Sequence, residues 1–131
     1  SLKFANHAVG SFLLSDRTPS PWTWEMALGE NAKFPKTGMN AIRFLGTRGA
    51  LEFPNLVLWR HDEEAGNWHH EITPEVIETP FIDAYIAQCE HLCAVARGFE
   101  EPIIDALNGS RSLDATLAAA RAANTGARIS L

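Results

Sequence analysis

Apolar and polar positions alternate along the first half of the chain, whereas apolar residues recur every three or four positions in the last third. Alternation predicts strands and the longer spacing predicts amphipathic helices. We therefore expect strands at 2–5, 8–16, 22–27, 41–45, 50–53, 56–59 and 67–72, helices at about 80–97 and 108–124, and an edge strand at 128–131. Strands followed by helices, rather than alternating with them, are typical of an α+β fold.

Turn and cap residues separate these elements. Asn6-His7 predicts a hairpin turn, and the prolines of 18–21 predict a loop, because proline lacks the donor that a strand ladder needs. For the first helix, Thr79 is a suitable N-cap, Pro80 a suitable first residue, and Gly98 a suitable terminator.

Composition narrows the class of protein. The 131 residues are 46% hydrophobic and 21% charged, with a formal net charge of −5, as expected of one globular domain. No apolar run approaches the roughly 20 residues of a membrane span, and no basic patch favours a nucleic-acid partner. Cys89 and Cys93, four apart on one helical face, are expected to be buried and reduced rather than a disulfide scaffold. Without a signal segment at its start, the chain is expected to be cytoplasmic.

The first residues suggest that the sequence is a piece of something longer. It begins at Ser1 without an initiator methionine, and apolar alternation starts at Leu2. We interpret the chain as one domain cut from a larger protein.

A histidine-rich stretch contains residue types that can bind a metal. These are His61, His69 and His70, with carboxylates at 62–64 and at Glu71. Adjacent residues of a strand point to opposite faces, so His69 and His70 would not ligate one ion together. We expect 62–66 to be a solvated hairpin tip and no metal to be bound.

The segment from Ser15 to Asn31 is richer in candidate chemistry. Its predicted strand, 22–27, lies between two loops and would place Trp22 and Trp24 on one face and Glu25 on the other. Indole rings beside hydrogen-bonding groups suit a sugar or polyol, whose C–H faces stack while its hydroxyls need partners. The alternative is two core tryptophans beneath a proline-stiffened loop, and composition alone does not choose between them. The chain contains no nucleophile elbow, phosphate-binding glycine loop or dinucleotide fingerprint.

Several segments, taken in order, resemble one family of oxidoreductases. Near the start of the chain, one segment resembles an F-x-N-G-A-x-G pattern, with His7 in place of the glycine. A segment in the middle is similar to G-T-x-G-x-L followed by L-x-L-W, and the last third resembles a pair of closing helices and a final strand. In this chain they are Phe4–Ser11, Ile42–Leu51 with Leu56–Trp59, and Ile82–Gly98 with Glu101-Pro102, Asn108-Gly109, Ser112-Leu113 and Thr125-Gly126. Together they resemble the C-terminal domain of the glucose–fructose oxidoreductase and inositol dehydrogenase family (Gfo/Idh/MocA).

The resemblance implies a fold and a function. It implies an open, mostly antiparallel sheet with helices packed on one face, and a homodimer or homotetramer formed through the other face. It implies hydride transfer between NAD or NADP and a sugar, cyclitol or related polyol. An N-terminal Rossmann domain would bind the dinucleotide and supply the catalytic lysine of a Glu-Lys-Pro motif.

Neither Glu-Lys-Pro nor the family's Asp-x-x-x-His motif occurs here, so we expect no catalytic residue in this chain. The resemblance favours the sugar-pocket interpretation, with Trp24, Glu25 and Asn31, and then Trp22 and Arg17, as substrate-binding candidates. The alternative function is a non-catalytic ligand-binding or dimerisation module of similar plan.

Overall fold

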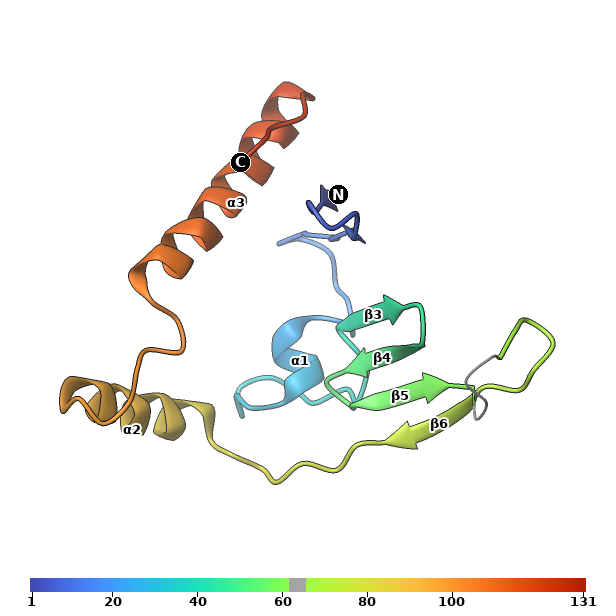
Figure 1. Cartoon of the computed structure of the whole chain (residues 1–131), viewed down its shortest axis with the longest axis horizontal. Helices are drawn as coiled ribbons and strands as arrows, with labels where there is room; N and C mark the ends of the chain where they lie inside the picture. The colour runs from blue at the N-terminus through green and yellow to red at the C-terminus, as the bar shows by residue number, and fades with distance from the viewer. Residues whose placement is uncertain (62–65) are drawn as a thin grey trace. The chain divides into compact units, whose positions relative to one another are not determined.

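The computed structural model describes residues 1–61 and 66–131. They form two compact units, Ser1–Pro80 and Phe81–Leu131. The described part of the first unit holds the strands and one short helix, and the second unit holds two longer helices (Figure 1). A mostly antiparallel sheet accompanied by helices confirms the expected α+β class.

The chain starts with a small hairpin. Strands β1 (Leu2–Lys3) and β2 (Val9–Gly10) pair antiparallel. The turn lies at Asn6-His7 as predicted, with Asn6 Oδ1 accepting from Ala8 N at 3.2 Å. His7 adopts a left-handed backbone with φ of 68°, a region that residues with a Cβ seldom enter. The second strand is much shorter than expected, since 11–15 carry no strand.

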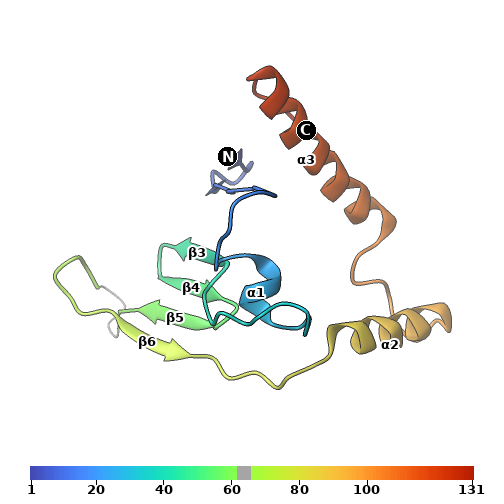
Figure 2. The ribbon, with the colours of Figure 1, turned by 180° about the vertical axis from the view of Figure 1, so that it is seen from behind.

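The main sheet is a four-stranded antiparallel meander. It consists of β3 (Ile42–Gly46), β4 (Gly49–Phe53), β5 (Val57–Arg60) and β6 (Thr73–Val76), in the order β3-β4-β5-β6. Figure 2 shows these strands side by side from behind, with β3 and β6 at the two edges. The first three lie within about one residue of their predicted positions.

The last strand of the meander lies at 73–76 and not at 67–72. Side chains of 67–70 close a turn instead: Asn67 Oδ1 accepts from His69 N at 2.9 Å, and His70 Nδ1 accepts from Asn67 N at 3.1 Å. These local bonds compete with a strand ladder for the same backbone donors. The strand that follows contains Pro74.

Pairing register divides the side chains of the sheet between two faces. The face that we call the Phe53 face carries Ile42, Phe44, Leu51, Phe53, Leu58, Arg60, Thr73 and Glu75. The opposite face, called the Trp59 face, carries Arg43, Leu45, Ala50, Glu52, Val57, Trp59, Pro74 and Val76. The Trp59 face includes one apolar row that crosses all four strands: Leu45, Ala50, Trp59 and Pro74.

The predicted strand at 22–27 is wrong, because this segment forms the short helix α1 (Trp24–Leu28). Thr23 is its N-cap and accepts from Met26 N at 3.4 Å. Gly29 ends the helix with φ of 70° and donates its N–H to Glu25 O at 3.0 Å. Caps at both ends thus prevail over the alternating pattern. Trp22 and Trp24 therefore do not share a strand face.

The second unit contains helices α2 (Ala84–Ala96) and α3 (Ala106–Thr125). Asp83, not Thr79, caps α2: its Oδ1 accepts from Tyr85 N at 3.0 Å and from Ile86 N at 3.1 Å. Asp105 caps α3 by accepting from Asn108 N at 2.7 Å, so this helix begins two residues before Asn108. Residues 128–131 form no strand, and the edge strand expected there is wrong.

The predicted apolar stripe of α2 is exposed in this structure. Tyr85, Ile86 and Leu92 are exposed, and so are Cys89 and Cys93, which were expected to be buried. The half-buried residues of α2 lie elsewhere on the helix, at Ala87, His91, Ala94 and Val95. The expected packing of the helices on one face of the sheet stays a prediction.

Candidate functional site

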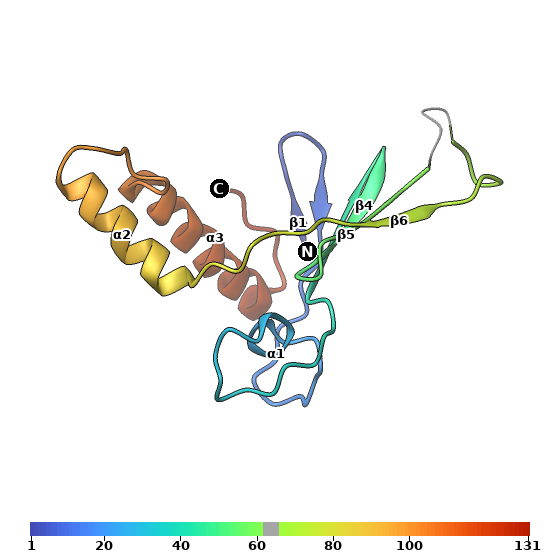
Figure 3. The same ribbon diagram turned by 90° about the horizontal axis from the view of Figure 1, so that it is seen from below.

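The candidate substrate-binding segment is centred on α1, which Figure 3 shows between the loops that precede and follow it. Trp24, the first residue of the helix, stacks on Phe53 of β4, with ring centroids 5.5 Å apart and planes inclined by 28°. Trp24 remains 51% exposed. The stack holds the indole ring against the Phe53 face and leaves an apolar surface that a ligand could cover.

Thr37 closes the loop that contains α1. Its Oγ1 donates to Pro21 O at 2.8 Å, and its N–H donates to Met26 O at 2.9 Å. The chain before the helix and the chain after it are thereby tied together. Ala27, in the same helix, is completely buried. This helix is thus held by specific bonds although it has only five residues.

Glu25 lies in the first turn of α1 and is exposed. Among the described residues it has no hydrogen-bond or ion-pair partner for its carboxylate. Both oxygens are therefore available to accept from the hydroxyls of a ligand. Trp22, also exposed, lies just before the N-cap Thr23. Its backbone N–H donates to Ser20 Oγ at 3.2 Å.

The remaining two candidates are placed differently. Asn31 Oδ1 accepts from Lys33 N at 3.0 Å and so closes a local turn, which leaves mainly its amide nitrogen for a ligand. Arg17 lies in a loop where its N–H donates to Ser15 Oγ at 3.3 Å. Its guanidinium forms no ion pair with the part of the chain that is described.

A network of amides and carboxylates lies next to Phe53 in the chain and supports this region. Glu52, whose side chain is 24% exposed, accepts from Asn40 Nδ2 at 3.0 Å and from Arg43 Nε at 3.3 Å. Asn40 Oδ1 in turn accepts from Asn55 N at 3.2 Å, and Asn55 Nδ2 donates to Gly38 O at 2.8 Å. The network ties the approach to β3 to the turn after β4. It was not predicted from the sequence, although two asparagines flanking a strand pair are a usable signal.

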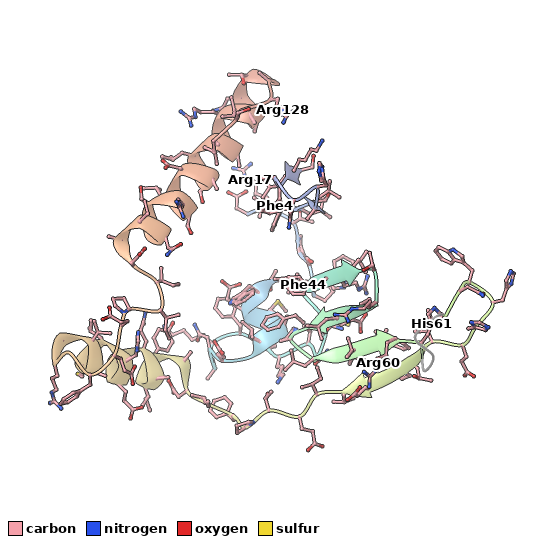
Figure 4. The ribbon with its side chains drawn as sticks, in the orientation of Figure 1. Phe4, Arg17, Phe44, Arg60, His61 and Arg128 are labelled. Atoms are coloured by element: carbon pink, nitrogen blue, oxygen red, sulfur yellow. The ribbon has the colours of Figure 1, made fainter. Side chains whose placement is uncertain are left out.

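A hollow of about 710 Å³ opens at the β3–β4 hairpin. Its lining includes Phe44, Leu51, Leu58, Arg48 and Arg60. Figure 4 labels Phe44 and Arg60, which come from β3 and β5. Arg60 Nη2 pairs with Glu75 Oε2 at 2.7 Å, whereas Arg48 has no ion-pair partner among the described residues. Gly46–Gly49 was predicted only as a turn, the hollow was not predicted, and none of the five candidates lines it.

The histidine-rich stretch is only partly described, since 62–65 lie outside the described residues. His61 Nδ1 contacts Glu71 O at 3.0 Å, and His70 Nδ1 is engaged by Asn67 N. Within 1–61 and 66–131, no three His, Cys, Asp or Glu side chains gather as metal ligands would. Over the same ranges, none of the helices has the length and apolar character needed to cross a membrane.

Comparisons with protein-family models, with curated proteins and with solved structures gave no match.

Proposed function

We propose that this chain is the C-terminal domain of an NAD(P)-dependent oxidoreductase that transfers hydride between the dinucleotide and a sugar, cyclitol or related polyol. In this proposal the domain shapes the substrate pocket and forms the subunit interface. The dinucleotide and the catalytic lysine belong to an N-terminal domain outside this sequence. No metal takes part.

The observation that carries the proposal is the backbone at His7. The family's pattern has glycine at this position, and His7 adopts a φ of 68°, where glycine is favoured. The resemblance at 4–10 therefore extends from residue types to a conformational requirement. The middle motif segments also support it: Gly46 ends β3, Gly49 begins β4, and Leu56–Trp59 overlaps β5.

Two surfaces suit the two tasks of such a domain. The stacked indole of Trp24 and the carboxylate of Glu25 offer a plane and an acceptor to a polyol. The apolar row across the Trp59 face, with Leu45 exposed at its β3 end, suits a subunit interface.

Kinetics of the full-length protein test the substrate assignment. We expect NAD- or NADP-linked oxidation of a polyol, and Glu25→Gln to raise KM about tenfold, because a hydrogen bond to a charged group contributes about 1.5–3 kcal/mol. Glu90→Gln, on α2, is the matched control and should leave KM unchanged. If Glu25→Gln and Asn31→Ala both leave the kinetics unaltered on a substrate that is turned over, the pocket assignment is wrong.

The 131-residue chain by itself tests whether the dinucleotide is bound by another domain. Calorimetric titration with NAD and with NADP should show no saturable binding, because the sequence contains no phosphate-binding glycine loop. Micromolar saturable binding would contradict the proposal.

Sedimentation should show a dimer or larger species at micromolar concentration, and a clean monomer would contradict the interface. If the gene upstream encodes no dinucleotide fingerprint, the alternative of a non-catalytic ligand-binding or dimerisation module replaces the enzyme.

A further inference from the structure

His91 joins α2 to the connection that leads into α3, and both ring nitrogens take part. Nδ1 lies 2.6 Å from Glu100 Oε2, and Nε2 lies 3.2 Å from the backbone N of Ile103. The imidazole ring is 26% exposed. One side chain of α2 is thus bound at two points to a connection of nine residues, 97–105.

These two partners determine where the imidazole proton lies. A backbone N–H can only donate, so Nε2 must offer its lone pair to Ile103. The carboxylate of Glu100 is an acceptor when ionised, so Nδ1 carries the hydrogen and donates it. The neutral ring with hydrogen on Nδ1 satisfies both contacts at once, and the other neutral tautomer satisfies neither.

We propose that His91, Glu100 and the Ile103 amide form a pH-sensitive clasp between α2 and the α2–α3 connection. Histidine is the side chain that most readily changes charge between pH 5 and 8. A proton taken up from solvent binds the Nε2 lone pair, and the Ile103 N–H then faces a donor and loses its acceptor. The Nδ1–H bond to the Glu100 carboxylate then joins two opposite charges, so it becomes an ion pair. Acid therefore releases the clasp at Ile103 and tightens it at Glu100.

Glu100 is the charge that governs this ring. On α2 the neighbouring charges are Glu90 and, at the C-cap, Arg97; on the connection they are Glu101 and Asp105. Of the described carboxylates, only Glu100 lies within 4.0 Å of an imidazole nitrogen of His91. Asp105 is already engaged as the cap of α3. The ring therefore has one carboxylate partner and one backbone partner.

The Ile103 end of the clasp lies close to the start of α3. Ile103 is two residues before the Asp105 cap, so the released bond lies immediately before the helix. Glu100 remains bound three residues earlier, and the connection is loosened at its α3 end only. This inference is independent of the proposed enzymatic function, because it concerns contacts within Phe81–Leu131 alone.

Nuclear magnetic resonance of the 131-residue chain tests the clasp. Long-range ¹⁵N–¹H spectra should show the His91 ring with hydrogen on Nδ1 at high pH, and the protection factor of the Ile103 amide should fall roughly fivefold as the ring gains a proton. The two transitions should share one midpoint. A ring with hydrogen on Nε2 at high pH, or Ile103 protection that does not change with ring protonation, would overturn the proposal.

Variants separate the two ends of the clasp. His91→Phe should abolish the pH dependence of Ile103 protection, whereas His69→Phe, which alters a histidine outside Phe81–Leu131, should preserve it. Glu100→Gln keeps an acceptor for Nδ1 and should leave Ile103 protected at high pH. Loss of that protection in Glu100→Gln would contradict the two-ended arrangement. If His91→Phe does not fold, the unmodified chain still decides the question through its own ring and amide.

Discussion

Replacement of Glu52 by alanine should lower the free energy of unfolding of the Ser1–Pro80 unit by about 2 kcal/mol. Its bond from Asn40 Nδ2 is a hydrogen bond to a charged group, and such bonds contribute about 1.5–3 kcal/mol. Its pair with Arg43 adds little, because the Arg43 side chain is 71% exposed and pairs of this kind contribute about 0–1 kcal/mol. The loss in Glu52→Ala thus comes chiefly from the Asn40 bond.

Urea unfolding followed by tryptophan fluorescence measures this loss. All four tryptophans, Trp22, Trp24, Trp59 and Trp68, lie within Ser1–Pro80, so the signal reports that unit. With an m-value of about 2 kcal/mol per molar, the midpoint should fall by about 1 M. Glu52→Gln, which retains an oxygen for Asn40, should lose clearly less.

Glu75→Ala is the matched control. It removes the partner of Arg60 from a pair whose two side chains are both more than half exposed, so the loss should be about 0.5 kcal/mol or less. Equal destabilisation by Glu52→Ala and Glu75→Ala would refute the argument that the Asn40–Glu52 bond supports the sheet.

Further outcomes concern the helix ends. Thr23→Ala should lower the free energy of unfolding, followed by fluorescence, by about 1 kcal/mol, because α1 loses the oxygen that caps Met26 N. An unchanged urea midpoint would contradict this cap. Gly29→Ala should lower the free energy of unfolding by about 1–2 kcal/mol, since φ of 70° disfavours a Cβ and the Lys36 side chain lies where this Cβ would be. Unchanged stability would contradict the left-handed conformation at Gly29. Asp105→Ala should lower the helix content measured by circular dichroism and destabilise α3 by about 1 kcal/mol, whereas unaltered ellipticity would locate the cap elsewhere.

The meander was predictable because its signals are local and agree with one another. Apolar alternation at 41–59 is interrupted by Gly46–Gly49 and by Pro54-Asn55, and the strands begin and end near these breaks. Segments in which two signals compete were predicted less well. At 22–27 the alternation of large residues favoured a strand, whereas Thr23 and Gly29 favoured a capped helix, and the caps prevailed.

The candidate site was predictable only as a segment. Trp24 and Glu25 were found from residue type, but the stack on Phe53 joins residues that are 29 positions apart in sequence. No periodicity links such positions. The turn-closing bond of Asn31 Oδ1 was equally unpredictable, since an asparagine in a loop serves a local turn or a ligand with the same side-chain atoms. The Asn40–Glu52 bond requires the strand register before it can be inferred.

The two edges of the meander differ in what they offer to another strand. Ile77 N, just after β6, donates to Leu56 O, just before β5, at 3.0 Å. Backbone groups alternate in direction along an antiparallel strand, so those of Thr73 and Glu75 also face β5. Those of Pro74 and Val76 face away from the sheet. Pro74 has no N–H, which leaves Val76 as the outward donor of that strand. The opposite edge, β3, contains no proline and exposes Phe44 and Leu45 beside its outward-facing backbone. The sheet is therefore blunted on one side, and an added strand would find a full set of donors only along β3.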